Sequence, residues 1–589
     1  MATSSQNGSA ILGLVSTIKE HPYGSVAVLV FLICLATRIV TGLRFRYGGA
    51  SHSSISPIPV VPYSTPWLGH TIPFALGFQS YLSRLSRSLG PDGGAFALVI
   101  GGSKHNIITS PSLAKQILFG RQSPINMDQL VYYHMNHFWD DHDTVRKMDP
   151  TAVWGSIHGV LIGMMREGFV NTAITATVQG VEERIWNLVG GCESWVDQSI
   201  WERSGNVSVV STLSQDRSEK GSHDRFVAEA SLHPLLRDFV GDLASMVLMG
   251  RDFMENNPNI LADLWSTDSK FNMFMIGLPT WFPSMAGPSA ARERIVKAMQ
   301  EHHDALMKFL DGEDPGSRWS DMSDVSSVMV DRVKAWRAAG APKRAYSTGD
   351  CAILWAMNVN ANQVIFWLVW YIFSDPSLLQ EIRREIRPYV KFREQNGTGL
   401  PIRESPKLAV DLPDLWNKCP LLKGAFFETM RLEAASTSYK TIEEDFVVTE
   451  SEDDARILGK TQPDRYLLPK GELLCIPHGA HQSDDRYWRD PHRFDPRRFW
   501  VKDTDEKEAG EIKVDYGTMK VWGGGKQMCK GKTFAEREVV LFVAAIVMCW
   551  EIEPVSNGGK WVHPGRIPGA GAVQPKHDVR VRMWRREEW

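Results

Sequence analysis

The sequence predicts a mainly α-helical fold, with a large helical domain, a small β region and an N-terminal transmembrane helix. The first observation is an almost wholly apolar stretch from Tyr23 to Gly42, long enough to cross a bilayer. The second is the recurrence of apolar residues every three or four positions along Val160–Val189 and Ser231–Leu248, which is typical of helices with one buried face. The third is a β-like run, Ala95–Ile100, which together with Asn106–Thr109 predicts a small hairpin.

Length and composition are consistent with one large α-rich domain and a tail. The chain has 589 residues, and hydrophobic residues make up 43% of it, enough for a sizeable core. Its formal net charge of −3 provides no basic field, so a nucleic-acid partner is not expected. The seven cysteines are scattered and odd in number, which argues against a disulfide framework and for a reducing compartment. They are Cys34, Cys192, Cys351, Cys419, Cys475, Cys529 and Cys549.

The apolar N-terminal stretch has the features of an uncleaved membrane anchor. Twenty helical residues span roughly 30 Å, the thickness of the hydrocarbon layer. Arg38 lies near the end of the stretch and can reach the lipid headgroups, and Arg44 and Arg46 follow directly. By the positive-inside rule, these charges place the downstream chain in the cytosol. A cleaved signal peptide is the alternative, but the stretch starts late and lacks a clear small-residue cleavage site.

These features divide the chain into predicted segments. Residues 1–22 are a short lumenal segment, residues 23–43 the transmembrane anchor, residues 44–66 a basic, proline-rich hinge and residues 67–589 the large folded domain. The hinge is expected to be stiff and extended, because proline fixes φ. Its prolines are Pro57, Pro59, Pro62 and Pro66.

A second long apolar run, Cys351–Phe373, is interrupted by amides. A transmembrane helix is one interpretation, but amides in the middle of such a helix are costly in lipid. A buried core helix that kinks open beside a ligand fits the pattern better. The amides are Asn358, Asn360, Asn362 and Gln363.

The candidate reactive centre is Cys529, which follows a glycine-rich turn and precedes an apolar helical run, Phe534–Trp550. Glycine lets the backbone turn tightly beside a flat ligand, and the start of a helix is expected to lower the pKa of a thiol. A single thiolate held this way suits one axial bond to haem iron. A zinc site is disfavoured, because no second Cys or His lies within ten residues of Cys529. A buried inert cysteine is the ordinary alternative, and it fits the other cysteines.

The stretch Trp522–Gly531 resembles the haem-binding signature of the cytochromes P-450. The signature is an aromatic residue, then glycine, then Cys-x-Gly, and it is filled here by Trp522, Gly525, Cys529 and Gly531. Gln527 occupies the position where the family usually has Arg or His to meet a haem propionate, and Lys530 replaces a common proline. Neither change removes the donor to iron.

Further motifs of the family follow in the expected order from about residue 57 to residue 586. Glu428 and Arg431 lie three apart on one helix face, within pairing distance, and Arg498 fills the family's second-arginine position. The resemblance implies that these three form a buried network that holds the cysteine segment in register. Lys440 stands where the family often has a propionate-binding arginine.

The resemblance also implies that Cys351–Phe373 crosses the distal face of the haem. The acid and alcohol that usually relay protons there are replaced by Val359 and Asn360. Asn360 is the predicted catalytic residue, because its amide can hydrogen-bond oxygen or a water, although it cannot serve as an acid. Trp355–Asn360 with Phe366–Trp367 is similar to the branch of sterol 7α-hydroxylases and prostacyclin synthase. That branch holds both hydroxylases and peroxide isomerases, so the reaction type stays open.

The resemblance therefore implies a membrane-anchored haem-thiolate monooxygenase, with haem b as cofactor and Cys529 as the axial iron ligand. The substrate is expected to be a bulky lipophilic molecule, such as a sterol, a triterpenoid, a terpenoid or a similar polycyclic, oxidised in a secondary-metabolite pathway. The other expected haem contacts are Trp522, Gly525, Gln527, Gly531 and Lys440. The predicted pocket residues are Ala356, Asn360, Ser436 and Ala570.

The family pattern also implies partners and a location. NADPH would supply electrons through a cytochrome P-450 reductase that docks near Lys526, Lys530 and Lys532, although a solvated rim of charges explains these lysines equally well. Residues 67–589 would form the cytosolic catalytic domain on a single-pass anchor in the endoplasmic reticulum membrane. Two alternatives stay open. One is a haem-thiolate isomerase or dehydratase that needs no NADPH, and the other is a non-catalytic haem-binding membrane protein.

Overall fold

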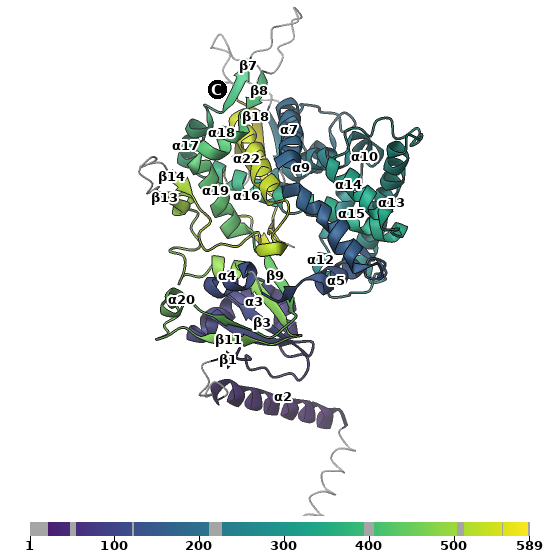
Figure 1. The fold of residues 1–589 in the computed structure, drawn as a ribbon. Coiled ribbons are helices and arrows are strands. Elements are labelled where there is room, and N and C mark those ends of the chain that lie inside the picture. The colour runs from purple at the N-terminus through teal and green to yellow at the C-terminus, as the bar shows by residue number, and fades with distance from the viewer. Residues whose placement is uncertain are drawn as a thin grey trace, which may run out of the picture. The chain divides into compact units, whose positions relative to one another are not determined.

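The computed structural model describes residues 22–47, 55–120, 123–165, 167–210, 227–393, 406–502, 512–555, 558–569 and 571–586. The chain divides into two compact units, whose helices and strands are labelled in Figure 1. Unit 1 comprises Met1–Met127 and Thr437–Pro491, and unit 2 comprises Asp128–Ser436 and His492–Trp589. The predicted mainly α-helical fold with a small β region is confirmed.

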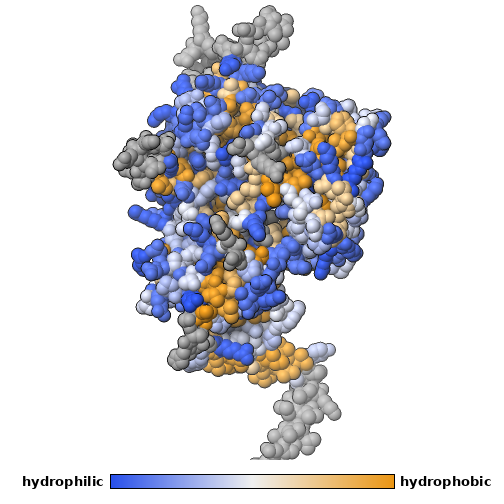
Figure 2. All heavy atoms as spheres, viewed as in Figure 1, coloured by the Kyte–Doolittle hydropathy of each residue, from blue (hydrophilic) through white to orange (hydrophobic). Residues whose placement is uncertain are grey.

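The N-terminal helix α2 (Pro22–Tyr47) presents apolar side chains to the outside along its length, and it is coloured as hydrophobic in Figure 2. Tyr23–Tyr47 is long and apolar enough to cross a membrane, with a mean hydropathy of 2.4. Arg44 and Arg46 lie in its last turn, so the helix continues beyond residue 43, where the hinge was expected to begin. The predicted lumenal segment before α2 lies outside the described residues.

The proline-rich segment after α2 is extended and joins a sheet of unit 1. Strand β1 (Ser56–Pro57) pairs in parallel with β11 (Arg465–Leu468). The Ala97 N–H then donates to Pro59 O at 2.8 Å, and the Val61 N–H donates to Ala97 O at 2.9 Å. Closely spaced prolines favour this extended backbone.

The predicted hairpin lies in unit 1, where β2 (Ala95–Ile100) pairs antiparallel with β3 (Ser103–Ile108). Gly101 and Gly102 connect the strands with φ of +56° and +82°, as a two-residue hairpin turn requires. The hairpin belongs to a five-stranded sheet of order β2-β3-β12-β9-β4. The other elements of unit 1 are α3 (Thr71–Ser88), η1 (Gly90–Gly94), α4 (Pro111–Phe119), β4 (Ile125–Asn126), β9 (Thr437–Ile442), β10 (Phe446–Thr449), α20 (Glu452–Ile457), β12 (Leu473–Pro477) and α21 (His478–Gln482).

Unit 2 is built mainly of helices. They are α5 (Asp128–Trp139), η2 (Ala152–Ile157), α6 (His158–Val160), η3 (Leu161–Met165), α7 (Glu167–Arg184), η4 (Ile185–Asn187), α8 (Ile200–Ser204), α9 (Leu232–Met249), α10 (Arg251–Asn256), α11 (Ile260–Asp268), α12 (Phe271–Met275), α13 (Pro283–Leu310), α14 (Ser327–Ala338), α15 (Lys343–Asn358), α16 (Ala361–Ser374), α17 (Pro376–Ile386), α18 (Leu412–Lys418), α19 (Pro420–Glu433), η5 (Pro496–Phe499), η6 (Gly525–Gln527) and α22 (Lys532–Cys549). The helix predicted over Ser231–Leu248 is α9, whereas the stretch Val160–Val189 is divided among several helices, of which α7 is the longest.

Short strands complete unit 2, and four of them form a sheet of order β15-β18-β6-β5. The strands are β5 (Ser208–Val210), β6 (Val227–Ser231), β7 (Val390–Arg393), β8 (Lys407–Val410), β13 (Trp500–Lys502), β14 (Ile512–Val514), β15 (Trp550–Pro554), β16 (Arg566–Ile567), β17 (Gln574–Pro575) and β18 (Arg580–Arg585).

The apolar run with internal amides forms two consecutive core helices, α15 and α16, which are interrupted at Val359 and Asn360. Across Lys343–Ser374, 72% of the most apolar stretch is buried inside the chain. Asn358 and Asn362 are buried and donate to Ser245 Oγ and Arg237 O, which explains how core helices accommodate them. The run is therefore a kinked core element rather than a membrane span.

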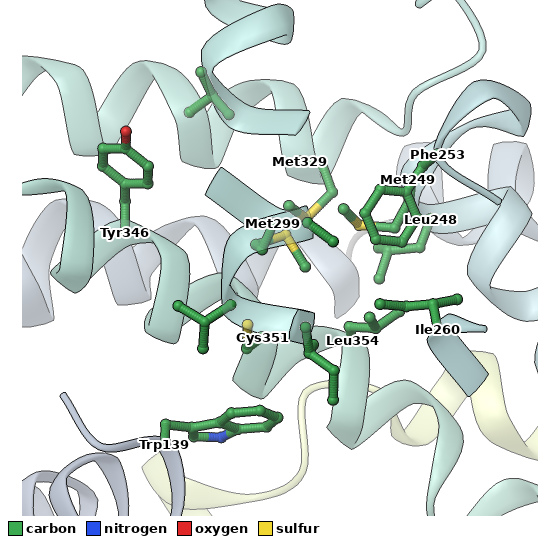
Figure 3. Packing of buried hydrophobic residues seen from close by; sticks show 14 of the residues in the cluster. Trp139, Leu248, Met249, Phe253, Ile260, Met299, Met329, Tyr346, Cys351 and Leu354 are labelled. Carbon is green, nitrogen blue, oxygen red and sulfur yellow. The ribbon is translucent and has the colours of Figure 1, made fainter. Parts of the chain in front are cut away.

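A large apolar core holds α15 in place as far as Leu354. Figure 3 shows Cys351 and Leu354 of α15 among side chains from α9, α13 and α14, with Trp139 at the end of α5 beside them. Cys351, Leu354 and Trp139 are fully buried. This packing fixes α15 up to the point where its accessible C-terminal turn begins.

Candidate functional site

Glycines shape the turn that carries Cys529. Gly523 and Gly525 have φ of +70° and +61°, which glycine adopts without strain. The Cys529 N–H donates to Trp522 O at 2.9 Å and closes the loop. Helix α22 begins at Lys532, two residues before the predicted start, so the cysteine lies directly in front of a helix N-terminus.

The Cys529 side chain is exposed, whereas four of the other cysteines are buried. Desolvation by the surrounding protein nevertheless raises the pKa of its thiol, although the N–H groups of Gly531 and Lys532 and the charge of Lys530 lower it. The expectation of a lowered thiol pKa is therefore wrong for the chain by itself. An accessible sulfur still fits an axial metal ligand, because coordination to a metal deprotonates a thiol.

Tyr516, a half-buried residue that the sequence alone did not single out, supports the cysteine loop. Trp522 Nε1 donates to Tyr516 Oη at 3.0 Å, and the Tyr516 hydroxyl donates to Glu536 Oε1 at 2.8 Å. The Tyr516 ring stacks on Phe427 of α19 with 3.7 Å between centroids. Burial, followed by the charge of Glu536, raises the pKa of Tyr516 well above its usual value, so the hydroxyl stays a donor. No regular spacing in the sequence links these residues.

The structure brings the three predicted network residues together. Arg431 donates from Nε and Nη2 to the two oxygens of Glu428 at 2.7 and 2.8 Å, and Arg498 Nε donates to Glu428 Oε1 at 3.0 Å. The Glu428 and Arg431 side chains are fully buried, and the Arg498 side chain is only 12% exposed. The Asp495 N–H adds a bond of 3.1 Å to Glu428. These bonds join α19 to η5 and to the segment before it.

At the end of α15, the side chains of Ala356 and Asn360 are accessible to solvent, although most of the surrounding residues are buried. They lie four apart in the sequence, a spacing that places two helical side chains on one face. Val359, at the position where an acid is expected, is buried and has no ionisable group. Asn360 Oδ1 accepts from the Ala572 N–H at 2.9 Å. The structure therefore orients this amide, and its Nδ2 is the remaining donor.

The segment that contacts Asn360 is a short hairpin of β16 and β17. It is held by an ion pair between the buried Glu433 and the partly exposed Arg566, which the sequence alone did not predict. Arg566 donates from Nε and Nη2 to the two oxygens of Glu433 at 2.7 and 2.6 Å. The Tyr371 hydroxyl donates to Glu433 Oε1 at 2.5 Å. Glu433 is fully buried, and it also anchors the hairpin through its backbone O, which accepts from the Val573 N–H at 2.8 Å.

Other residues predicted to line the pocket or to contact the haem are Ser436, Ala570, Gln527 and Gly531. Ser436 donates its hydroxyl to Val521 O at 2.8 Å, so in this structure it supports the cysteine loop. Ala570 and the side chain of Gln527 lie outside the part of the chain that the structure describes. Gly531 is free of close contacts, but a Cβ there would lie 4.0 Å from Cys529 Sγ and would narrow the access to the sulfur.

Lys440, in β9 of unit 1, is a buried cation. Its Nζ donates to Met127 Sδ at 3.6 Å, and among the described residues no carboxylate pairs with it. Burial lowers the pKa of Lys440 to about 8. A thioether is a weak acceptor, and buried charges are normally paired, so this environment fits an anionic ligand such as a carboxylate.

The lysines next to Cys529 are partly engaged in the loop itself. Lys530 Nζ donates to Lys526 O at 2.7 Å. Lys532 Nζ lies 3.9 Å from Glu536 Oε1 and above the Tyr516 ring. The Lys526 side chain is exposed.

Comparisons with known proteins identify a family and several relatives of this chain. The family model of cytochrome P450 matches residues 204–580. The chain is 21% identical to the cytochrome P450 monooxygenase efuG of Hormonema carpetanum, over 98% of this chain and 99% of that protein. It is 22% identical to the cytochrome P450 monooxygenase poxD of Penicillium oxalicum, over 85% and 88% of the two chains. It is also 22% identical to the human 7-alpha-hydroxycholest-4-en-3-one 12-alpha-hydroxylase, over 89% and 92%.

Proposed function

The chain belongs to the cytochrome P450 family, and from that premise we propose that it oxidises a bulky lipophilic polycycle, such as a sterol, triterpenoid or terpenoid, in a secondary-metabolite pathway. As a member of this family it is a haem-thiolate monooxygenase and an oxidoreductase. Bound haem supplies the activation of dioxygen and the insertion of one oxygen atom into a C–H bond. The chain's own residues hold the iron, orient the substrate and control access to it.

The observation that carries the proposal is the accessible Cys529 thiol in front of α22. The turn is closed by the bond from the Cys529 N–H to Trp522, and Trp522 is fixed in turn by Tyr516. A ligand held by a hydrogen-bonded frame keeps its geometry when the iron binds. The ion pairs of Glu428 with Arg431 and Arg498 likewise hold α19 and η5 together.

The accessible end of α15 supports a role on the substrate side. Asn360 has its amide oxygen engaged by Ala572, so it offers a donor rather than an acceptor to a bound molecule. The preceding position, where the family has an acid, is Val359. Proton delivery would then proceed through water, which Asn360 Nδ2 can orient as a hydrogen-bond donor.

The substrate class is supported by the relatives and by the apolar surroundings of the site. One relative is named for 12α-hydroxylation of a sterol ketone, and others are fungal monooxygenases. Near the accessible face of α15, the rings of Trp355 and Phe271 stack with 5.5 Å between centroids. Flat aromatic surfaces of this kind suit a rigid polycyclic ligand.

The anchor and the electron supply complete the proposal. Helix α2 supports membrane attachment, and we assign it to the endoplasmic reticulum with the catalytic domain in the cytosol, following the basic residues Arg44 and Arg46. NADPH would deliver electrons through a reductase whose acidic surface meets Lys526 and its neighbours. An acidic partner fits these charges because Lys526 is exposed.

An optical titration of the purified, full-length ferric protein tests the substrate class. A panel of sterols, triterpenoids and terpenoids is added, and displacement of water from the iron is read as a change in spin state. A shift with one scaffold, followed by turnover that depends on NADPH and reductase, supports the proposal. An intact thiolate spectrum with no shift from any member contradicts the proposed substrate class.

A haem-thiolate isomerase or dehydratase is the second candidate. It is favoured by the valine at position 359, where the family usually has an acid. Such an enzyme rearranges a peroxide or a pre-oxidised substrate and needs no external electrons. Turnover of organic peroxides at the same rate with and without NADPH would establish this function instead. A non-catalytic haem-binding protein is not favoured, since it gives no reason for the accessible side chains at the end of α15.

A further inference from the structure

His134 of α5 is an imidazole with one buried nitrogen that has no hydrogen-bond partner. Its ring lies among Phe138, Phe271 and Trp355, with centroid separations of 5.3, 5.9 and 5.4 Å. Within the described part of the chain, no donor or acceptor reaches the buried Nε2. An unpaired buried polar atom destabilises a fold, so its retention calls for a use.

The groups around His134 cannot supply the missing bond. The Trp355 indole N–H already donates to Asp268 Oδ1 at 2.9 Å, and Asp268 Oδ2 accepts from Gln574 at 3.0 Å. The other two neighbours are phenylalanines and have no polar atom. Within this cluster of aromatic rings, His134 Nε2 is a polar atom without a partner.

The helix that carries His134 is fixed at its C-terminal end. Arg292 of α13 donates to Phe138 O at 3.1 Å, and Arg344 of α15 donates to Trp139 O at 3.3 Å. Cations at this end of a helix satisfy its last carbonyls and complement its dipole. The position of His134 is thus set before any ligand binds, as recognition of a rigid molecule requires.

His134 lies beside the part of α15 that we assign to the substrate side. The Trp355 ring contacts His134, and the next residue in the chain is Ala356, whose side chain is accessible together with that of Asn360. We propose that His134 is a specificity-determining residue that hydrogen-bonds one oxygen substituent, a hydroxyl or a ketone, on the polycyclic substrate. This inference rests on the proposed function.

The chemistry of the ring suits both kinds of substituent. Burial lowers the pKa of His134 to about 4, so the imidazole is neutral at physiological pH. In a neutral imidazole one nitrogen donates and the other accepts, so a hydroxyl can bind to either tautomer and a ketone to the protonated nitrogen. A hydrocarbon skeleton would leave Nε2 unpaired, and a pocket built around a polar atom discriminates against such a ligand.

The test uses the full-length ferric protein and matched probes, cholestanol and cholestane, with hydroxylated and deoxygenated pairs of a triterpene and a diterpene alongside. His134→Phe should weaken binding of the oxygenated member of the matching pair by about tenfold, while the hydrocarbon binds as before or more tightly. His134→Gln should restore part of the difference. The matched control is His137→Phe in the same helix, because His137 already hydrogen-bonds Tyr133 O at 3.0 Å. That variant should leave both dissociation constants unchanged.

Thermal stability separates recognition from packing. His134→Phe removes an unpaired polar atom, so its melting temperature should equal or exceed that of the unmodified protein. Equal loss of affinity for both members of a pair, or unchanged affinity for both, would overturn the inference while leaving the proposed function standing. A thiolate spectrum that shifts with no probe would overturn the proposed substrate class, and the inference with it.

Discussion

At Cys529 two effects of opposite sign act on one thiol. The N–H groups at the start of α22 and the charge of Lys530 lower its pKa, whereas desolvation raises it by more. The two lowering effects come from groups next to Cys529 in the sequence, so the glycine-rich turn before an apolar helix predicts them. The extent of desolvation depends on how the folded chain encloses the thiol, which the local sequence does not specify.

Replacement of Cys529 by alanine tests the iron ligand. Cys529→Ala removes the axial donor, so the carbon monoxide complex of the reduced protein should lose its thiolate absorption band entirely, and NADPH-dependent turnover with it. The measurement is the reduced carbon monoxide difference spectrum. Cys192→Ala, at a partly exposed cysteine, should leave the band unchanged. A normal band in the Cys529 variant would refute the assignment of this ligand.

Lys440 should destabilise the haem-free protein but help the loaded protein to retain haem. Burial lowers its pKa to about 8 in the folded chain, from 10.5 when it is exposed. Between these values the unfolded chain holds a proton that the folded chain has lost, so the stability of the haem-free protein should rise with pH across this window. Below about pH 8 the group contributes a constant penalty, because it is charged in both states.

Lys440→Met should therefore stabilise the haem-free protein by about 1–3 kcal/mol at neutral pH and remove its rise in stability above about pH 8. If Lys440 pairs with a haem propionate, the same variant should release haem faster once loaded. Thermal melts of the haem-free protein and haem transfer to apomyoglobin measure the two effects. Lys470→Met, at an exposed lysine of the same unit, is the control and should change neither. Unchanged haem release would remove Lys440 from the haem site.

At the scale of elements, burial decides which ion pairs matter. The pair of Glu428 and Arg431 is fully buried, whereas Glu381 and Arg497 form a pair with 42% and 45% of their side chains exposed. Glu428→Ala would leave the charges of Arg431 and Arg498 without their carboxylate, so we expect a loss of about 3–5 kcal/mol and largely haem-free protein. Glu381→Ala should cost less than about 1 kcal/mol. Full haem loading in the Glu428 variant would show that the network is not required.

The β16–β17 hairpin links the ion pair of Glu433 and Arg566 to Asn360. Arg566 holds one end of the hairpin to Glu433, and the Ala572 N–H at the other end orients the Asn360 amide. Asn360→Ala should lower the fraction of electrons recovered in product several-fold, with haem incorporation intact. Arg566→Gln should do the same by loosening the hairpin.

The double variant tests this coupling, since two residues that act through one contact are not additive. The variant that combines Asn360→Ala with Arg566→Gln should convert the same fraction of consumed NADPH into product as Asn360→Ala alone. The ratio of product to NADPH consumed is the measurement. If the two substitutions lower this ratio additively, Arg566 acts through a contact other than Asn360. If Asn360→Ala leaves the ratio unchanged, Asn360 has no part in the mechanism.

At the scale of the whole molecule, patterns local in sequence were predictable and long-range pairings were not. The hairpin of β2 and β3, helix α9 and the break at Asn360 each follow from periodicity or from polar residues within one short segment. The pairing of Glu433 with Arg566 joins residues 133 apart and leaves no such pattern. The division into units was also hidden, because β12 inserts between β3 and β9 from a distant part of the chain.

Helix α2 carries the last prediction, because it determines whether the protein is an integral membrane protein. Its apolar side chains are exposed over a span of 25 residues, and burying them in lipid is favourable in proportion to their area. The full chain should stay in the membrane pellet after alkaline carbonate extraction. A chain that begins after Tyr47 should be released into the supernatant with its thiolate spectrum intact, since Cys529 and its frame belong to unit 2. Removal of residues 1–20 alone, which keeps α2, is the matched control and should leave the protein in the pellet. Release of the full chain by carbonate would show that α2 does not cross the bilayer.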